Sequence, residues 1–532
     1  MIIIFIVLSP AHFLIDARQH YVKMRKVLAT PRVYCERLLW LASHAHLRVR
    51  PRPLVRGRSL SIDVGQPSHF THPHLLQEDE ILPGMDKAEF AQRRSRLMEL
   101  VANTHTGMTN PHHLVIIPGA PTLYMSQDVP YRFHQNTDLF YLTGFQEPDC
   151  VLLLETIPHS SLPSHTSTLY VRPRDPHREQ WDGPRPGPEG TVDFTGVDQA
   201  YNLDDLPDHL EKRYSGGDYS VWYYTESTPH PEQDQLITSS LTRSPISKIK
   251  SVHSPSHQLQ ELRLTKSPAE LVLMRRAADI ACLAFTKAME ATRPGLNEHQ
   301  LESVFEHSVK MSGAQRMSFP PVVAGGPRAT CLHYITNNRD LLEGEMVLVD
   351  AGCQYFGYVS DITRTWPVSG KFTPAQRDLY QLVLTVKQES IEMCRAGVTL
   401  NYLNSLAVEM LADGLIDMGL MSDRLSPIDL SNTMGRLFPH HLGHYLGLDT
   451  HDTMLVDRNT ELEPGMVLTI EPGVYLPQDY HLQGSSAATA LAGCGIRLED
   501  NVAVNEDGRE VLSHSCPQTT SELTRLIGTR HH

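Results

Sequence analysis

The sequence lacks several features that would assign a protein to a class at once. Its eight cysteines among 532 residues are scattered without a CxxC pair, which excludes a disulfide-stapled scaffold and favours a reducing compartment. No apolar run reaches the ~18 residues that a membrane-spanning helix needs, so no membrane span is expected. No HExxH motif is present, which excludes the type of zinc site that this motif forms on a helix. No basic stripe with interleaved aromatic residues occurs, so no nucleic-acid partner is expected.

Acidic residues are almost missing from the first 60 positions. That segment holds eleven Lys/Arg and two Asp/Glu, a net charge of +9, which leaves −23 for the remainder of a chain whose total is −14. From Met24 the segment is Arg-rich and partly amphipathic, as mitochondrial transit peptides are. We therefore predict a presequence over residues 1–64 with its working start at Met24, and a mitochondrial protein with an additional cytoplasmic form. The alternative is a disordered basic tail that does not act as a targeting signal.

The first part of the body predicts a compact α/β domain over residues 65–250. Helical spacing of apolar residues predicts a helix, and strand-like runs follow it. The helix is expected over residues 86–104, and the strands over 113–119, 138–145, 149–156, 167–173 and 221–227. Residues 228–258 are rich in Ser, Pro and Gln, and we place the linker at their end, over residues 251–258.

The second part predicts a larger domain over residues 259–520, followed by a tail over 521–532. Ser267, Pro268 and Glu270 form a capping box with proline in the first turn, which predicts a long helix over 267–292. Further helices are expected over 297–313, 374–395 and 402–419, and strands over 346–351, 358–363, 466–471 and 495–504. Helices and strands alternate in both domains, so the fold class is α/β (α+β).

Two apolar strands within residues 345–368 each carry one aspartate, Asp350 and Asp361. A buried carboxylate is costly unless something pairs with it. If the segment is a hairpin with its turn near residues 355–357, the two aspartates are symmetric about the turn. Their Cβ atoms would then lie ~4.5–5.5 Å apart. Two carboxylates at that distance must share either a proton or a cation.

Later strands repeat this pattern. Glu471 and Glu499 each occupy an apolar strand, and the segment HHLGHYLGLDTHD between them supplies His440, His441, His444 and His451. Four carboxylates and one imidazole suit two divalent ions, and oxygen-rich ligation favours Mn²⁺. Paired ions can activate water and polarise a carbonyl, which is a hydrolase design. The alternative is strand-end caps, exposed edge glutamates and ordinary loop histidines, and spacing alone does not decide.

Longer motifs add a resemblance to a known family. HYITNNR, MVLVDAGCQYFGYVSDITRTWPVSGKFTPAQ, HHLGHYLGLDTHD, VLTIEPGVY and GIRLED resemble the aminopeptidase P branch of the pita-bread metallopeptidases. VPYRFHQNTDLFYLTGFQEPD and RDPHREQWDGPR resemble motifs of its N-terminal domain, and GQPSHFTHPHLL and PPVVAGG resemble its mitochondrial members. The resemblance implies an N-terminal creatinase/aminopeptidase P domain before a pita-bread catalytic domain. It implies hydrolysis of the N-terminal Xaa-Pro bond of peptides, trimming of N-termini in mitochondria, and a homodimer.

The same resemblance assigns the metal ligands. They would be Asp350, Asp361, His444, Glu471 and Glu499. Asp361 and Glu499 would bridge both ions, while Asp350 would complete one ion near the substrate amine. Glu471 would also handle the proton of the attacking water.

Other site residues are likewise implied by resemblance. Catalytic roles fall on His333, His451, His440, Arg497 and Glu471, and substrate contacts on Phe319, Asp350, His444, His451, Tyr475 and Trp181. His451 would steady the tetrahedral intermediate, His440 would line the proline side of the pocket, and Arg497 would organise the carboxylates. The sequence departs from the family at Phe319, where tyrosine is common, and at Asn501, where an acid is common.

Two other functions remain open at this level. A prolidase-type dipeptidase shares the same ligands, and a non-catalytic binding or scaffold protein could use the same fold. The HQNTDLFYLTGF motif favours the aminopeptidase. The presence of all five implied metal ligands disfavours a non-catalytic protein. A bond before proline has no N–H and a fixed φ, so a rigid pocket of rings would suit it.

Overall fold

The computed structural model describes residues 63–104, 112–157, 163–214, 219–224, 230–243 and 249–528. These residues belong to one compact unit, Ser61–His532. Nearly all of the predicted presequence, including its start at Met24, lies outside the described residues. Within the described ranges, no helix is both long and apolar enough to cross a membrane.

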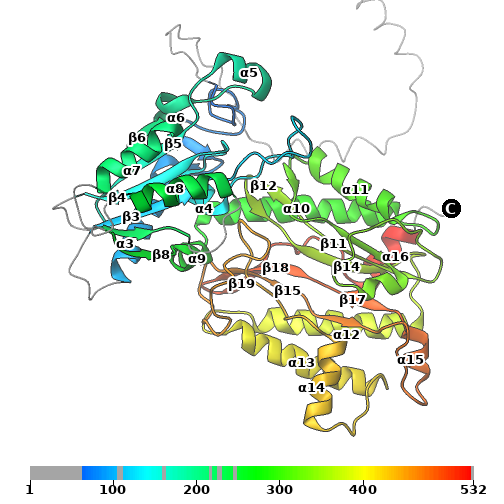
Figure 1. The fold of residues 1–532 in the computed structure, drawn as a ribbon. Helices are drawn as coiled ribbons and strands as arrows, with labels where there is room; N and C mark the ends of the chain where they lie inside the picture. Colours follow the sequence, from blue (N-terminus) through cyan, green and yellow to red (C-terminus); the bar gives the residue numbers. More distant parts are fainter. Residues whose placement is uncertain are drawn as a thin grey trace, which may run out of the picture. The chain divides into compact units, whose positions relative to one another are not determined.

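The N-terminal part is built on one sheet. In the described part of the chain six strands pair in the order β6-β5-β4-β3-β7-β8 (Figure 1). They are β3 (His113–Pro118), β4 (Val151–Thr156), β5 (His165–Val171), β6 (Gln199–Asn202), β7 (Tyr219–Trp222) and β8 (Ile249–His253), and the short β1 (Glu80–Leu82) and β2 (Met85–Asp86) pair separately. The helices are α3 (Lys87–Asn103), α4 (Thr137–Thr143), α5 (Pro176–Asp182), α6 (Gly187–Thr195), α7 (Leu206–Tyr214), α8 (Pro231–Arg243) and α9 (Ser256–Leu264).

Both faces of this sheet are covered. In β3, Leu114 and Ile116 belong to the core that includes residues of α7 and α8. Val115 and Ile117 belong to the core on the other side, which includes residues of α3. Successive side chains of a strand point to opposite faces, so a strand buried on both sides is a continuous apolar run. The run HLVIIP has that pattern, and the strand predicted there is confirmed.

One predicted strand is wrong. Residues 138–145 lie largely in the helix α4, because their ends carry helix caps. The side chain of Asn136 accepts a hydrogen bond from the backbone N–H of Leu139 at 3.0 Å, and Gly144 ends the helix in the left-handed conformation. A short apolar run without alternation fits either a helix or a strand, and here the capping residues favour the helix.

The region predicted as a linker contains regular structure. β8 pairs in parallel with β7, and α9 follows it directly. The sheet of the N-terminal part therefore continues into residues 251–253. The division of the chain at residues 250–259 stays a prediction.

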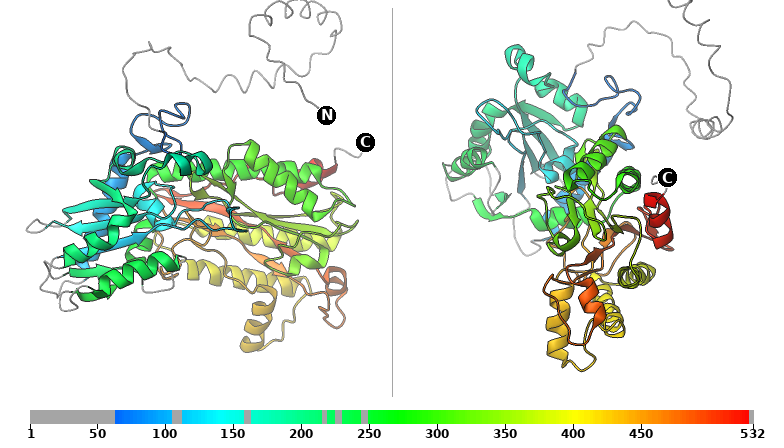
Figure 2. Two further views of the ribbon diagram at one scale, coloured as in Figure 1. Left: turned by 45° about the horizontal axis from the view of Figure 1, so that its top comes forward. Right: turned by 90° about the vertical axis from the view of Figure 1, so that its right-hand side faces the viewer.

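The C-terminal part places strands between two pairs of helices, α10 with α11 and α12 with α13 (Figures 1 and 2). The helices are α10 (Pro268–Ala291), α11 (Glu298–Met311), α12 (Pro374–Met393), α13 (Leu400–Asp417), α14 (Pro427–Leu437), α15 (Ser486–Leu491) and α16 (Thr520–Gly528). The predicted capping box of α10, formed by Ser267 and Glu270, is confirmed. Leu523 and Ile527 of α16 are buried in the main core, although this segment falls in the predicted tail.

Short strands carry the site residues. They are β9 (Arg316–Met317), β10 (Val322–Gly325), β11 (Met346–Ala351), β12 (Cys353–Tyr355), β13 (Tyr358–Val359), β14 (Ile362–Pro367), β15 (Val467–Ile470), β16 (Gly473–Tyr475), β17 (Gly495–Arg497), β18 (Asp500–Asn505) and β19 (Gly508–Val511). Among these strands the pairing orders are β10-β11-β14, β13-β12-β9, β15-β18-β19 and β16-β17. The single strand predicted over 495–504 is two strands, and Glu499 lies between them.

The predicted hairpin exists, but its turn is centred one residue later in the chain than predicted, so each strand residue has a different partner. Asp350 of β11 pairs with Thr363 of β14, not with Asp361. The turn is at Phe356 and Gly357, which both have positive φ (48° and 91°), as a two-residue hairpin turn requires. Asp361 is two residues before Thr363 and so is diagonal to Asp350 rather than opposite to it.

Candidate metal centre

Four predicted ligands are acids that come from separate strands and meet in the interior. Asp361 and Glu499 are almost fully buried, and Asp350 and Glu471 are partly buried. Asp361 follows β13, Glu499 lies between β17 and β18, and Glu471 follows β15. Because each strand is packed in the core, the carboxylates are held on a rigid frame rather than on long loops.

The backbone of Asp361 is fixed by Asn501 of β18. The Asn501 Oδ1 atom accepts a hydrogen bond from the backbone N–H of Asp361 at 3.1 Å. The Nδ2 group of Asn501 donates to the carbonyl of Asp361. An amide side chain can accept and donate at once, whereas an ionised aspartate can only accept. The unusual Asn501 therefore holds the peptide of a predicted bridging ligand from both sides.

Glu499 and Asp350 are connected through Thr363 and Arg497. The Thr363 hydroxyl donates to Glu499 Oε2 at 2.7 Å. The Nε of Arg497 donates to Thr363 Oγ1 at 3.1 Å, and its Nη2 donates to Asp350 Oδ2 at 2.6 Å. The structure places Arg497 against Asp350, and its connection to Glu499 runs through Thr363, which the sequence argument missed.

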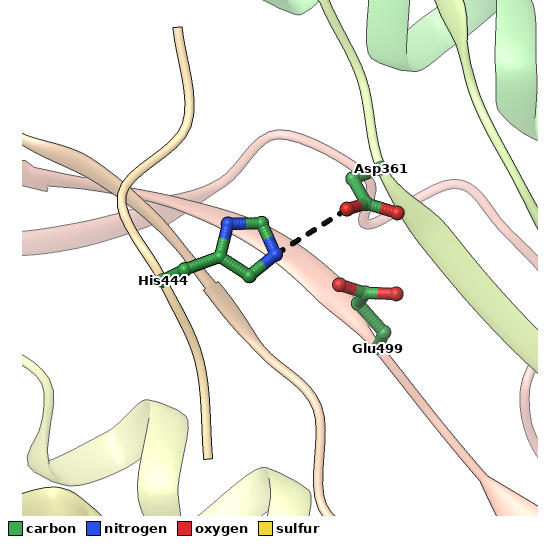
Figure 3. Close-up of side chains that lie close together, drawn as sticks. All are labelled: Asp361, His444 and Glu499. Atoms are coloured by element: carbon green, nitrogen blue, oxygen red, sulfur yellow. Dashed lines mark ion pairs between the residues drawn. The ribbon is translucent and has the colours of Figure 1, made fainter. Parts of the chain in front are cut away.

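His444 faces the same cluster. Its Nε2 lies 3.4 Å from Asp361 Oδ2 and 3.6 Å from Glu471 Oε1. Figure 3 shows the imidazole pointing toward the carboxylates of Asp361 and Glu499. Its Nδ1 lies 3.0 Å from the carbonyl of Tyr445, which can only accept, so Nδ1 carries the proton. The lone pair of Nε2 is thereby directed at the carboxylates, as a metal-binding histidine requires.

The crowded acids resist ionisation in the protein alone. Burial, followed by the negative charge of Asp350, raises the pKa of Asp361 well above its usual range. Burial and the nearby Asp361 do the same to the pKa of Glu499. Burial and the charge of Glu499 raise the pKa of Glu471 to about 8. Among the described residues, Arg497 is the one fixed cation bound to these groups, so the carboxylates outnumber the positive charges.

The cluster fits divalent metal ions. Donor atoms of Asp361, His444 and Glu499 all lie within 4.8 Å of one another. Among the described residues, one oxygen each of Asp350, Asp361 and Glu499 is buried without a hydrogen-bond partner. Unpartnered buried carboxylate oxygens are costly unless they bind a cation. Four acids against one arginine leave an excess of three negative charges, which two divalent ions would more than neutralise.

His440 and Tyr475 form a wall beside the acids. The Tyr475 hydroxyl lies 2.7 Å from His440 Nε2 and accepts a hydrogen bond from Arg497 Nη1 at 2.7 Å. The Nδ1 of His440 lies 2.9 Å from the carbonyl of His441. Burial, followed by the charge of Arg497, lowers the pKa of His440 to about 3, so the ring is neutral. Both nitrogens of His440 are engaged, which suits a rigid pocket wall better than proton transfer.

His451 and His333 lie at the more exposed side of the centre. The rings of His444 and His451 are 4.5 Å apart in an edge-to-face arrangement. Burial lowers the pKa of His451, and the nearby His444 and His333 lower it further. His333 and His451 both keep solvent-exposed surface, so only part of the His451 ring is buried. The structure thus brings these two predicted residues to one side of the metal centre.

Two predicted substrate residues are not linked to the centre by any described contact. Trp181 lies in α5 of the N-terminal part and is 77% exposed. Phe319 is partly buried ahead of β10. Their roles stay predictions.

The structure also adds residues that the sequence argument did not place in the site. Thr363 is two positions after Asp361, so the period of a strand puts both on one face. That spacing was a usable signal for Thr363. Asn501 was noticed only as a departure from the family pattern, and its bonds to Asp361 join positions 140 residues apart, which no local pattern indicates.

Metal-free protein should lose stability as the pH rises from 6.5 to 8. The folded pKa of Glu471, about 8, exceeds that of an unfolded glutamate, so the folded state holds an extra proton in this window. That contribution is full at low pH and is lost as the pH rises through 8, at up to about 1.4 kcal/mol per pH unit. The partly buried His440 and His441 have the opposite effect, because their pKa values are lowered to about 3 and 4, but they act only below pH ~6.5.

Thermal unfolding of chelator-treated protein at pH 6.5, 7.2 and 8 measures this effect. Glu471→Gln is the control, because it cannot ionise and should flatten the decline. Addition of Mn²⁺ should raise the melting temperature most at pH 8, where the ligands give up protons most readily. A melting temperature that rises steadily toward pH 8 without metal would contradict the prediction.

Comparison with known proteins agrees with this geometry. Residues 272–506 match metallopeptidase family M24, and residues 90–222 match the aminopeptidase P N-terminal domain. The chain is 40% identical to Xaa-Pro aminopeptidase 3 of Homo sapiens over 87% of this chain and 90% of that protein. It is 37% identical to the mitochondrial intermediate cleaving peptidase 55 of Arabidopsis thaliana over 88% and 89%. A zinc-substituted aminopeptidase P of Escherichia coli in complex with product superposes with a TM-score of 0.77 at 34% identity, over 84% and 99%.

Proposed function

The chain belongs to the aminopeptidase P branch of metallopeptidase family M24, and we propose how its own residues carry out the reaction of that family. It is a metal-dependent aminopeptidase that hydrolyses the N-terminal Xaa-Pro bond of peptides. The observation that carries this function is the buried cluster of four carboxylates and one imidazole, in which three carboxylate oxygens are without partners.

Five residues would hold two divalent ions. They are Asp350, Asp361, His444, Glu471 and Glu499. Such ions activate a water molecule and polarise the carbonyl of the first substrate residue. Mn²⁺ is the ion we propose, because four of the five ligands are carboxylates. Asp361 and Glu499 would be shared by the two ions in this proposal, because each is almost fully buried and has an oxygen without a hydrogen-bond partner.

Glu471 is proposed to move the proton. One of its carboxylate oxygens faces His444 Nε2 at 3.6 Å, and the other faces His440 Nδ1 at 3.8 Å. In the metal-free cluster, burial and the charge of Glu499 raise the pKa of Glu471 to about 8. Bound cations would favour the ionised carboxylate, which is the form that can accept a proton. In this scheme Glu471 takes a proton from the attacking water and delivers it to the prolyl nitrogen, which must be protonated to leave.

Polar and aromatic neighbours are proposed to orient the substrate. His451 and His333 lie on the exposed side, where a donated hydrogen bond would stabilise the developing negative charge on the carbonyl oxygen. His440 and Tyr475 form the rigid wall against which a proline ring would pack. Proline has no N–H to satisfy, so a wall whose polar atoms are already paired suits it. Asp350 would bind the free α-amine, and Phe319 and Trp181 complete the proposed substrate contacts.

A tripeptide should be a much better substrate than a dipeptide. We expect Gly-Pro-Gly to be cleaved at least about tenfold more efficiently than Gly-Pro, because the N-terminal part resembles the domain of aminopeptidases and not only the shared metal site. Comparison of kcat/KM for the two peptides with Mn²⁺ present measures this preference, and Gly-Ala-Gly serves as the control for proline selectivity. Efficient cleavage of Gly-Pro alone would favour the prolidase-type dipeptidase.

The cellular setting is proposed from the relatives. A relative in Arabidopsis thaliana is named a mitochondrial intermediate cleaving peptidase. We place this chain in mitochondria, with an additional cytoplasmic form, where it trims peptides and proteins with proline at the second position. A homodimer is the proposed assembly, and exposed Trp181 is the proposed contact with the partner.

A further inference from the structure

A buried ion cluster lies behind the segment that carries His451. We call residues Gly447–Thr453 the His451 loop. Arg263, near the end of α9, is almost fully buried and contacts this loop twice. Its Nη2 donates to Asp449 Oδ2 at 2.5 Å and to Asp452 Oδ1. Thr450 and His451 lie between these two aspartates, so the chain is bound to one guanidinium on both sides of His451.

Lys266 completes the binding of Asp452. Its Nζ lies 3.2 Å from Asp452 Oδ2, and both side chains are 1% exposed. The backbone N–H of Asp452 donates to the carbonyl of Tyr445 at 3.0 Å. Both carboxylate oxygens and the amide of Asp452 are thus held. The residue that follows His451 has almost no freedom to move.

The same guanidinium reaches the N-terminal part of the chain. Arg263 Nη1 donates to Asp138 Oδ1 of α4 at 2.7 Å, and the hydroxyl of Thr137 donates to Asp449 Oδ1 at 2.8 Å. The other oxygen of Asp138 accepts from the Tyr224 hydroxyl at 2.6 Å. Two residues of α4 therefore bind the cluster that holds the His451 loop.

This ion cluster would add little to the free energy of unfolding if stability were its only role. Three carboxylates share two cations in a mostly buried cluster, and buried ion pairs are often no better than apolar contacts for stability. A guanidinium that binds three carboxylates does fix geometry, because its donors have a rigid planar layout. The geometry at stake is that of His451, whose ring packs edge-to-face on His444 at 4.5 Å.

We propose that Arg263 is a positioning residue that joins α4 of the N-terminal part to the His451 loop and thereby holds the His451 side chain for reaction. The proposal rests on the proposed function of His451 in stabilising the transition state. The N-terminal part would then influence the chemical step through the position of His451, in addition to any contact with the peptide. Displacing the loop would change the placement of His451, while the contacts that hold Asp350, Asp361 and Glu499 lie outside the loop. His444 shares the carbonyl of Tyr445 with Asp452, so its metal binding is measured alongside activity.

Arg263→Lys is the primary test, with Arg275→Lys as the matched control. Lysine keeps the charge but cannot bind three carboxylates in one plane. Arg275 makes a two-bond pair with Glu510, at 2.6 and 2.7 Å, away from the loop. We expect Arg263→Lys to lower kcat about tenfold with KM changed less than twofold, because His451 acts in the transition state. Arg275→Lys should leave both constants within twofold of the parent.

A double-mutant cycle with His451→Ala separates positioning from general stability. If Arg263 acts through His451, then Arg263→Lys should cost less than twofold in kcat once His451 is gone. A full tenfold loss in that background would overturn the proposal. Asp138→Asn is nearly isosteric and tests the same connection from α4 if Arg263→Lys does not fold. It should behave as Arg263→Lys does, and an unchanged kcat would also overturn the proposal.

Amide hydrogen exchange supplies a measurement that does not depend on activity. In metal-free protein, Asp138→Asn should speed exchange at least fivefold in peptides covering residues 447–453, while Arg275→Lys should not. Unchanged exchange would overturn the connection between α4 and the loop. If the parent protein fails to cleave Xaa-Pro peptides but exchange still rises in Asp138→Asn, the proposed function fails and the connection stands.

Discussion

Asp361→Ala should abolish peptidase activity, with kcat/KM falling by at least about a thousandfold. Asp361 is the ligand most deeply surrounded by the others: His444 Nε2 lies 3.4 Å from one of its oxygens, and its other oxygen is unpartnered. If it bridges both ions, its removal disturbs both at once. Metal ions supply several kcal/mol of transition-state stabilisation, and each 1.36 kcal/mol is a factor of ten in rate.

Metal content and kinetics should be measured together for this variant. We expect fewer than two ions per chain in Asp361→Ala, while the melting temperature of the metal-free form rises because a crowded buried carboxylate has been removed. His440→Ala is the matched control, since it removes a neighbouring wall residue outside the ligand set. Its loss of activity should be smaller by at least about tenfold. Two bound ions and near-parental activity in Asp361→Ala would refute the bridging assignment.

Glu471→Gln should show the second large effect, a loss of at least about a thousandfold in kcat. Glutamine has nearly the same shape, but it cannot accept the proton of the attacking water and is a poorer metal ligand. Because the pKa of Glu471 is raised to about 8 by burial and Glu499, the variant should also change the pH dependence of metal binding. Calorimetric titration of Mn²⁺ at pH 6.5 and 8 would measure this change.

The control for Glu471→Gln is Glu510→Gln, which makes the same chemical change in a surface ion pair with Arg275. We expect it to retain parental kcat, because Glu510 lies in β19 outside the cluster. Persistence of peptidase activity in Glu471→Gln at neutral pH would show that another group carries the proton. His451, whose ring packs on His444, would then be the next candidate to test.

The strand-borne acids were the part of the site that sequence could reveal. A carboxylate in an apolar strand is conspicuous, and four of them in one domain indicated a shared cation. The exact pairing of the two hairpin strands could not be predicted. The left-handed conformations of Phe356 and Gly357 fix the turn, and the alternation of apolar and polar residues does not indicate them. The apolar run in α4 likewise predicted a strand, since only Asn136 and Gly144 distinguish it from one.

The charged residues behind the site were beyond the reach of sequence. Arg263, Asp138 and Asp452 are ordinary surface types, and nothing in their spacing indicates that they meet. Their burial depends on α4 and α9 packing beside the His451 loop, which lies 312 positions after Thr137 of α4 and 189 positions after Arg263 of α9. Long-range packing of this kind is decided by the whole core, so local pattern cannot report it.

The five proposed metal ligands are spread from Asp350 to Glu499 and meet only after β11, β14, β15, β17 and β18 have assembled. No fragment of the nascent or translocating chain can hold the ion pair. If the protein enters mitochondria as an extended polypeptide, it arrives without metal and selects its ions where it folds. Its cofactor would then reflect the supply of free ions in that compartment as much as the preference of the ligands. Protein made in a foreign host would carry the metal of that host.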